Sequence, residues 1–236
     1  MKKILIIIFL LFAGVVGFYI GLTQRPIVVS VHQTGSATST VVLTGGQVLS
    51  NPFGNNSGKP TSLPWYISRA SALAAYLLMF AIIVWGMGLT TGFTYKITNP
   101  VKAWGIHKYM SISFGVLVLV HIISLLFDKY VSFGIGDILL PFVGNYKEPY
   151  LAFGVIGFYL LVIIIFSSLL VRIKYQAFWR VAHYLVYPLF VVSLIHGLFI
   201  GTDTQAVAVQ TMYWITGIIF VFILFYRFVF YKASPE

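Results

Sequence analysis

The chain has 236 residues, of which 59% are hydrophobic and 8% charged, with a mean hydropathy of +0.95 and a formal net charge of +10. This composition is typical of an integral membrane protein and leaves little chain for a soluble catalytic domain. The basic residues lie at the ends of apolar stretches rather than along one face, which argues against a nucleic-acid partner, and the absence of cysteine excludes disulfides and thiolate-held metal clusters.

Residues 1–22 begin with Met1-Lys2-Lys3 and continue as an apolar run. The run has no clear small-residue cleavage site, so we predict an N-terminal membrane anchor, with a cleaved signal sequence as the alternative. Residues 23–64 are polar and rich in Gly, Ser, Thr, Asn and Pro, and we predict an extracytoplasmic segment there. Within it, Ile27–His32 and Thr40–Thr44 alternate as the two strands of a short hairpin would.

Residues 65–231 hold five further apolar stretches, each about as long as the 20 residues that a helix needs to cross the hydrocarbon core. They are approximately Trp65–Leu89, Trp104–Asp128, Leu151–Val171, Phe178–Ile200 and Val207–Phe230. The turn signal Asn99-Pro100 predicts a loop over Gly92–Lys102, and a longer loop is expected over Asp128–Tyr150. Together with the anchor, the pattern predicts an all-α integral membrane protein, a six-helix transmembrane bundle.

Lysine and arginine predict the orientation, because cytoplasmic loops carry an excess of both. With the N-terminus inside, ten of these residues lie on the inner side: Lys2, Lys3, Lys96, Lys102, Lys108, Arg172, Lys174, Arg180, Arg227 and Lys232. Five lie on the outer side: Arg25, Lys59, Arg69, Lys129 and Lys147. We therefore expect a multi-pass protein of the cytoplasmic membrane, surrounded by membrane lipid, with both termini inside.

Four histidines lie in two of the predicted spans, His107 and His121 in one, His183 and His196 in the other. The first two are 14 residues apart, which places them about 40° apart around the helix and about 21 Å apart along it. The second two are 13 residues apart, about 19.5 Å along the helix but rotated by about 140°. Pro188 lies between them and is expected to kink and re-phase that helix, because it removes a backbone donor and clashes with the preceding turn.

If the two helices pack side by side, His107 meets His183 at one depth and His121 meets His196 at another. Each pair suits one haem iron with two axial imidazoles, and an apolar span offers the dry slot that a porphyrin needs. We therefore predict two haems between the third and fifth helices. Five glycines of the spans would let backbone approach a flat ring or simply serve helix packing: Gly105, Gly115, Gly154, Gly157 and Gly197.

Other interpretations of the histidines stay open. In the first, they form hydrogen bonds between helices. In the second, they line a path for transition-metal ions or protons. In the third, the protein is an assembly factor and the histidines are dispensable. A proton path is expected to include carboxylates within the spans. The acidic residues here lie at or beyond the span ends: Asp128, Asp137, Glu148, Asp203 and Glu236.

The region from about Trp65 to Asp203 resembles the ferric reductase-like transmembrane family. The resemblance rests on RASALAAYLL after Ser68, on HKYMSISFGVLVLVH, on DKYVSF with Pro141-Phe142, and on RIKYQAFWRVAHYLVYPLFVVSLIHGLFIGTDT. The family includes iron reductases, the membrane part of NADPH oxidases and the haem subunit of bacterial methionine sulfoxide reductase systems.

The resemblance implies two b-type haems with bis-histidine ligation and electron flow from the cytoplasmic to the outer side. It assigns His107 and His183 to an inner haem and His121 and His196 to an outer one.

The resemblance also implies roles for four further residues. Arg69 matches an arginine near the outer end of its span, where it would neutralise a haem propionate or stabilise a reduced species; snorkelling to lipid headgroups is the alternative. Arg172, Trp179 and Arg180 match a basic inner turn that would meet inner-haem propionates or a docking flavoprotein. The positive-inside rule explains the two arginines of that turn equally well.

Iron reductases and NADPH oxidases of this family usually continue into a flavin- and nicotinamide-binding domain, and this sequence has no GxGxxG-type loop. We therefore expect an oxidoreductase component, a cytochrome b that receives electrons from a separate FAD-containing flavoprotein or from quinol. The expected acceptor is ferric iron, oxygen or a partner protein on the outer side. A haem subunit dedicated to one extracytoplasmic reductase, of the methionine sulfoxide reductase type, is the alternative.

Overall fold

The structure is a computed structural model that describes residues 29–31, 41–43, 63–128, 131, 133–144 and 146–229. The chain divides into two units, residues 1–60 and 61–236, and each is described by itself. In the first unit, β1 (Val29–Val31) pairs antiparallel with β2 (Val41–Leu43). This pairing confirms the predicted hairpin. The anchor predicted over residues 1–22 lies outside the described residues.

The second unit is built from helices. They are, in chain order, α2 (Leu63–Thr91), η1 (Phe93–Lys96), α3 (Pro100–Leu126), α4 (Ile135–Leu139), α5 (Glu148–Phe166), its π-helical extension η2 (Ser167–Val171), α6 (Gln176–His183), α7 (Val186–Ile200), η3 (Thr202–Gln205) and α8 (Val207–Val229). Among the residues that the structure describes, five spans are long and apolar enough to cross a membrane: α2, α3, α5 with η2, α6 with α7, and α8. They confirm the five spans predicted after residue 64.

The start of α3 differs from the prediction. The helix begins at Pro100, four residues before Trp104, so the loop predicted over Gly92–Lys102 is wrong in its last three residues. Asn99 caps the helix, because its side chain accepts a hydrogen bond from the Lys102 amide over 2.9 Å. Proline fits the first helical position, where its missing N–H would have no partner inside the helix.

The loop predicted over Asp128–Tyr150 is also shorter than expected. It contains the one-turn helix α4, and it ends at Glu148, where α5 begins with Pro149 in its first turn. Both helix starts were missed for the same reason. The apolar pattern begins about one turn inside each helix, whereas the capping residues that set its first turn are polar or proline.

The predicted span Phe178–Ile200 is broken between α6 and α7. Pro188 explains the break, because it has no N–H to donate to the carbonyl of Tyr184, four residues earlier. That carbonyl instead accepts from the amide of Tyr187 over 3.2 Å, which is a tighter turn than an α-helix makes. The predicted kink is therefore confirmed.

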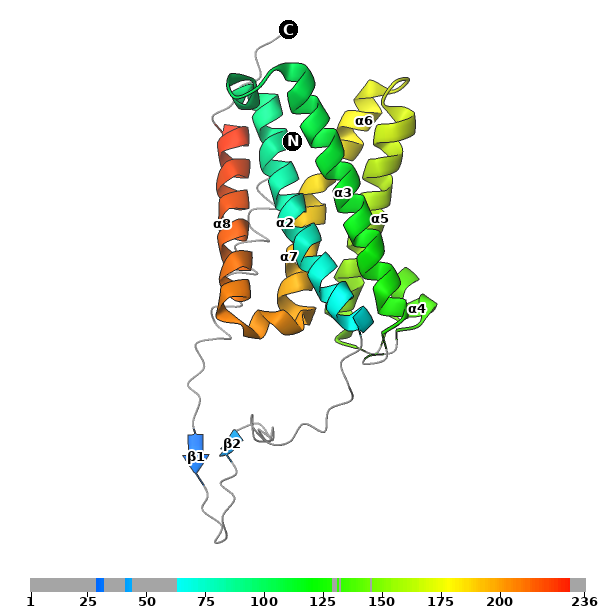
Figure 1. Cartoon of the computed structure of the whole chain (residues 1–236), viewed down its shortest axis with the longest axis vertical. Coiled ribbons are helices and arrows are strands. Elements are labelled where there is room, and N and C mark those ends of the chain that lie inside the picture. Colours follow the sequence, from blue (N-terminus) through cyan, green and yellow to red (C-terminus); the bar gives the residue numbers. More distant parts are fainter. Residues whose placement is uncertain are drawn as a thin grey trace. The chain divides into compact units, whose positions relative to one another are not determined.

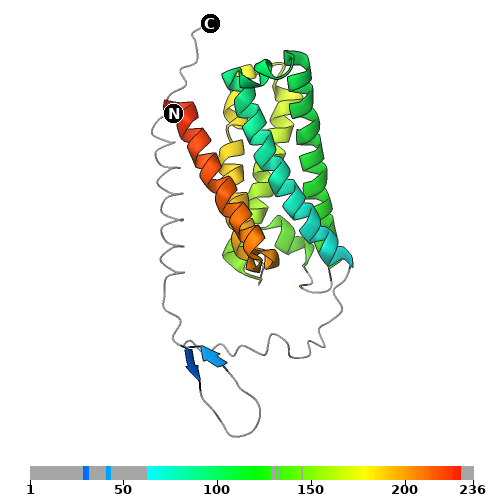
Figure 2. The same ribbon diagram turned by 60° about the vertical axis from the view of Figure 1, so that its left-hand side comes forward.

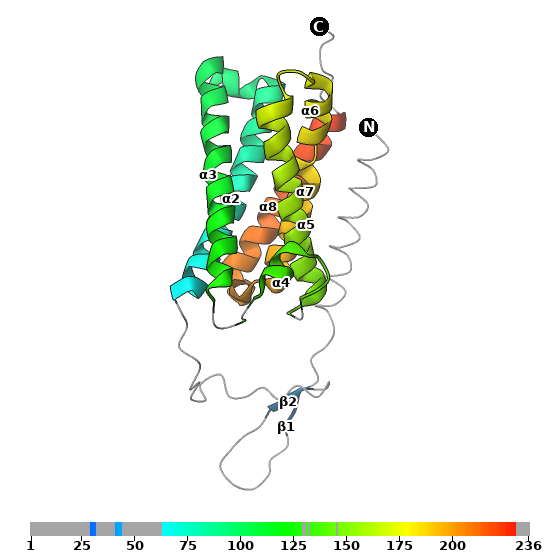
Figure 3. The ribbon, with the colours of Figure 1, turned by 90° about the vertical axis from the view of Figure 1, so that its right-hand side faces the viewer.

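The bundle consists of two closely packed helix pairs. α2 packs along α3, and α5 packs along α7, as Figures 1 and 2 show for the first pair and Figure 3 for the second. By contrast, α3 has no extended backbone contact with α5, α6 or α7. A side-chain-lined space therefore separates the helices that carry the histidines.

α8 closes the bundle against α2 and α7 through an aromatic core. Phe190 of α7 is fully buried and stacks on Phe220 of α8, with ring centroids 4.3 Å apart, and on Tyr76 of α2 at 5.7 Å. The Tyr76 hydroxyl forms a 2.6 Å hydrogen bond with Thr216 of α8, so the polar end of this ring is satisfied. These contacts join α8 to the two helix pairs.

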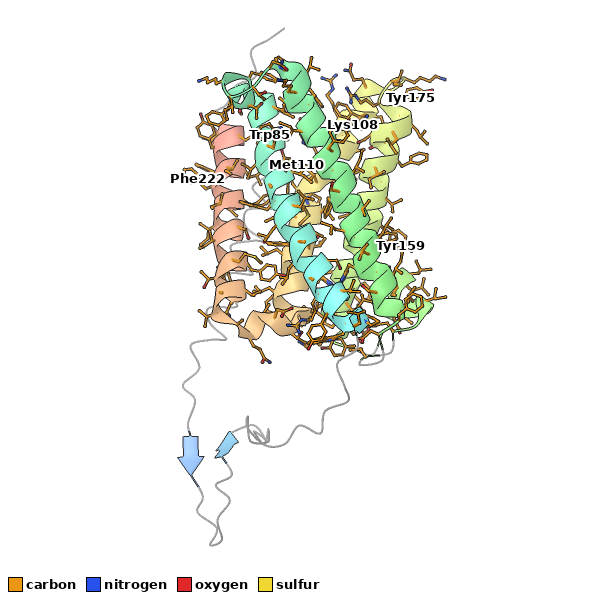
Figure 4. The ribbon with its side chains drawn as sticks, viewed as in Figure 1. Trp85, Lys108, Met110, Tyr159, Tyr175 and Phe222 are labelled. Carbon is orange, nitrogen blue, oxygen red and sulfur yellow. The ribbon has the colours of Figure 1, made fainter. Side chains whose placement is uncertain are left out.

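The described charges divide the bundle into two ends. The basic end holds Lys96, Lys102, Lys108, Arg172, Lys174, Arg180 and Arg227. The acidic end holds Asp128, Asp137, Glu148 and Asp203, together with Arg69 and Lys147. Between the ends, apolar side chains such as Phe222 point away from the bundle (Figure 4), as expected of a surface that faces lipid.

Candidate metal centres

His107 of α3 and His183 of α6 meet near the basic end. Their ring centroids are 6.2 Å apart, and the ring planes are inclined at 60°. Gly86 of α2 backs the first ring closely, since a Cβ atom on Gly86 would lie 3.2 Å from the His107 Cε1. The break before α7 ends α6 at His183, and the structure thereby brings together the first pair expected from the spacing.

The Nδ1 atoms of this basic-end pair are unusual. Among the described residues, three buried side-chain polar atoms have no hydrogen-bond partner: Thr94 Oγ1, His107 Nδ1 and His183 Nδ1. An unsatisfied buried polar group costs about 1–3 kcal/mol. Two such groups in one pair are unfavourable for packing alone.

Two tryptophans and an arginine surround the basic-end pair. Trp179 lies 5.4 Å from the His183 ring, and Trp104 lies 6.3 Å from the His107 ring. The Arg172 guanidinium is 5.3 Å from the Trp104 ring centroid and 5.4 Å from that of Trp179. Trp104 was not singled out from the sequence, although it lies one helical turn before His107 and hence on the same face.

Arg180, the other arginine singled out from the basic turn, is exposed on α6. The residue of that turn whose ring approaches the histidines is its neighbour Trp179. Trp179 therefore lies beside the histidine pair, whereas its neighbour Arg180 is exposed.

His121 of α3 and His196 of α7 line one cavity of about 150 Å³ toward the acidic end. The rest of the cavity wall is mostly apolar and comes from α2, α3, α4, α5, α7 and α8. It includes Met79, Phe114, Val155, Leu161 and Leu189. The space is half open and mostly apolar, with the two imidazoles at its wall.

Backbone carbonyls orient both imidazoles of this cavity. The His121 Nδ1 lies 3.0 Å from the carbonyl oxygen of Ser68, and the His196 Nδ1 lies 2.8 Å from that of Tyr150. A carbonyl oxygen only accepts, so we assign the proton to each Nδ1; the Ser68 hydroxyl also lies 3.0 Å from the His121 Nδ1. The Nε2 atoms then keep the lone pairs that bind a metal, and such hydrogen bonds are the usual supports of metal-binding histidines.

Gly154 of α5 makes room for the His196 ring. A Cβ atom there would lie 2.5 Å from the His196 Cε1 and 2.6 Å from its Nδ1. This glycine was one of five noted in the sequence, where ordinary helix packing explained it equally well. The structure assigns it to the histidine site.

Arg69 lies at the acidic end. It forms an ion pair with Asp203 of η3, in which its Nε donates to Oδ2 over 2.6 Å. Its guanidinium also lies 3.9 Å from the Trp65 ring centroid. Asp203, to which the sequence assigned no role, therefore holds the arginine that was expected near the outer haem.

These features define a multi-pass membrane protein with a histidine pair toward each end of its helical bundle. A model of the ferric reductase-like transmembrane component family matches residues 70–194, more than half of the chain, and the chain belongs to this family. The match contains His107, His121 and His183 and ends two residues before His196. Searches of curated proteins and of solved structures gave no match. Membership indicates transmembrane electron transfer as the general activity.

Proposed function

We propose that this protein is a membrane cytochrome b that carries electrons across the cytoplasmic membrane through two haems. His107 and His183 bind one haem iron near the basic end. His121 and His196 bind the other near the acidic end. A b-type haem bound in this way supplies the one-electron redox chemistry of its iron.

The separation of the basic-end rings supports the proposal. A metal–imidazole bond is about 2 Å long, and an imidazole nitrogen lies about 1 Å from its ring centroid. Two imidazoles that both bound one iron would have ring centroids at most about 6 Å apart. The His107 and His183 centroids are separated by 6.2 Å.

The number of ligands supports haem over a bare metal ion. In the part of the chain that the structure describes, no three His, Cys, Asp or Glu side chains come together. A bare Zn²⁺ ion takes about four ligands in a closed protein site, so a histidine pair is too few. A haem would bring four nitrogen ligands of its own, so that a pair of histidines such as His107 and His183 would be enough to hold it. A histidine-lined transporter is correspondingly disfavoured.

The charges of the bundle ends support a direction. We place the basic end at the cytoplasmic face, with both termini inside and residues 1–22 as a sixth helix, because positive residues are retained on that side. A separate flavoprotein or quinol delivers electrons at the basic end, where Trp104, Trp179 and Arg172 adjoin the first histidine pair. The acceptor at the acidic end is ferric iron, oxygen or an extracytoplasmic reductase that this chain serves as its haem subunit.

The observation that carries the proposal is the presence of two histidine pairs, one toward each end of a bundle of membrane-spanning helices. The experiment is to purify the protein in mild detergent and record oxidised and dithionite-reduced spectra with the haem-to-protein ratio. We expect a b-type spectrum with two haems per chain. His107→Ala and His196→Ala should each retain one haem. A colourless wild-type protein after haem supplementation would refute the proposal.

A further inference from the structure

Two cations at the acidic end bind the same segment of the chain. This segment, Phe199–Asp203, joins α7 to η3, and we name it the α7–η3 corner. Arg69 at the start of α2 pairs with Asp203. Lys147, which precedes α5, donates from its Nζ to the carbonyl oxygens of Phe199 over 3.0 Å and of Ile200 over 3.5 Å. The corner is thus tied to both helix pairs of the bundle.

Each cation also lies next to the residue that orients a histidine. Arg69 directly follows Ser68, whose carbonyl accepts from His121. Lys147 is linked to Tyr150 by a backbone hydrogen bond of 2.9 Å, and the Tyr150 carbonyl accepts from His196. The Tyr150 ring in addition stacks on Phe199 of the corner, with centroids 4.8 Å apart. Arg69, which contacts the corner, and Ser68, which accepts from His121, therefore lie in one short segment. Lys147, which contacts the corner, and Tyr150, which accepts from His196, lie in another.

We propose that Arg69, Asp203 and Lys147 form a clasp that positions His121 and His196. The inference rests on the proposed function, since it concerns the orientation of the imidazoles that bind the outer haem. Arg69 and Lys147 are positioning residues: the first holds the start of α2 and the second holds the start of α5 against the corner. This differs from the role that the family resemblance implied for Arg69, which was to neutralise a haem propionate or stabilise a reduced species.

The contacts of Arg69 favour the clasp over propionate binding. Its guanidinium already has a carboxylate partner and an aromatic ring beneath it, and the side chains of Arg69 and Asp203 are only 30% and 21% exposed. A half-buried ion pair that also packs on an aromatic ring is held in one geometry, unlike an exposed pair. Such a pair fixes the position of the backbone next to it.

The clasp has a predictable effect on the haem. A carbonyl that accepts from Nδ1–H raises the basicity of the imidazole, which stabilises the oxidised iron. Loosening the clasp lengthens this hydrogen bond, so the reduction potential of the outer site rises. Removal of a nearby positive charge has the opposite effect, because the cation no longer stabilises the reduced iron, and the potential falls. In Arg69→Asp and Lys147→Met, which remove a positive charge, the direction of the shift therefore separates positioning from charge. In Asp203→Arg both effects raise the potential, so there the EPR spectrum and the recovery in the double exchange separate them.

The test uses the His107→Ala background, in which only the outer site binds haem. The variants are Arg69→Asp, Asp203→Arg, the double variant with both exchanges, and Lys147→Met. Lys102→Met, which removes one exposed charge at the basic end, is the matched control. The readouts are the low-spin ferric EPR spectrum, which reports imidazole orientation, and the midpoint potential from a redox titration.

We expect each single clasp variant to shift the EPR g values and to raise the midpoint potential. The double exchange should restore both, because it rebuilds the ion pair in reverse, and Lys102→Met should change neither. The clasp would be overturned by unchanged EPR spectra in the single variants, by a lowered midpoint potential, or by a double exchange without recovery. In each of these cases, two haems in the wild type would still support the proposed function. A wild type without haem would overturn both.

Discussion

The contact between Gly154 and His196 offers a sharp test of the acidic-end site. Gly154→Ala adds one methyl group, and its carbon would lie 2.5 Å from the His196 Cε1 and 2.6 Å from the Nδ1. Carbon atoms in ordinary contact are about 3.5–4.0 Å apart, so the ring must move by about 1 Å. That movement breaks the 2.8 Å hydrogen bond between His196 and the Tyr150 carbonyl.

The expected cost combines two effects. Overpacking of a closely fitted site costs about 1–3 kcal/mol. A buried donor left unpaired costs a further amount of about 1–3 kcal/mol. We therefore expect Gly154→Ala to lower the free energy of unfolding by about 2–6 kcal/mol. A change in the support of a metal ligand weakens metal binding by about 10- to 100-fold, so the outer haem should be lost on dilution while the inner one stays.

The assay is haem content after gel filtration in detergent, together with the thermal midpoint of the same sample. Gly115→Ala is the matched control, because its added carbon would lie 3.7 Å from Ile165 Cδ1, which is ordinary contact. The control should keep two haems and the wild-type thermal midpoint. Equal haem content and stability in the two variants would refute the packing argument for His196.

Three further predictions concern the rest of the bundle. Phe190→Ala removes a fully buried ring from the aromatic core and should cost about 3–5 kcal/mol, visible as a large drop in thermal midpoint; a drop of only a few degrees would contradict it. Pro188→Ala restores a backbone donor and should straighten the break between α6 and α7, which would turn His183 away from His107. The reduced spectrum should then lose about half its b-type intensity. Trp85→Phe removes the 3.0 Å hydrogen bond from the Trp85 indole to the Ala103 carbonyl and should cost about 1 kcal/mol in thermal stability without changing haem content; loss of haem would show that this contact also orients the first site.

The five spans were predictable because a helix can cross the bilayer if about 20 consecutive residues of the sequence are apolar, whatever their neighbours in space. The histidine pairing was predictable for a similar reason, since 14 and 13 residues of helix reach nearly the same depth. Pro188 was predictable as a kink, because its missing N–H acts within one turn of its own helix. Each of these features depends only on residues that are close together in the sequence.

The supports of the histidines were not predictable from the sequence. The Ser68 and Tyr150 groups that accept from His121 and His196 are backbone carbonyls, which every residue possesses. Which carbonyl meets which ring depends on the rotation and tilt of two helices that are far apart in the chain. Helices surrounded by lipid are apolar on all sides, so their sequence pattern carries little information about rotation.

The sequence by itself thus determined the membrane-spanning helices, the two histidine pairs and the break near Pro188. Only the tertiary structure decided that Arg69 pairs with Asp203, that Gly154 accommodates His196, and that Trp104 joins Arg172 beside the basic-end pair. The physical reason is that hydropathy and helix geometry act along the chain, whereas ion pairs, close packing and ring contacts form between segments whose relative orientation is set by packing of the whole bundle.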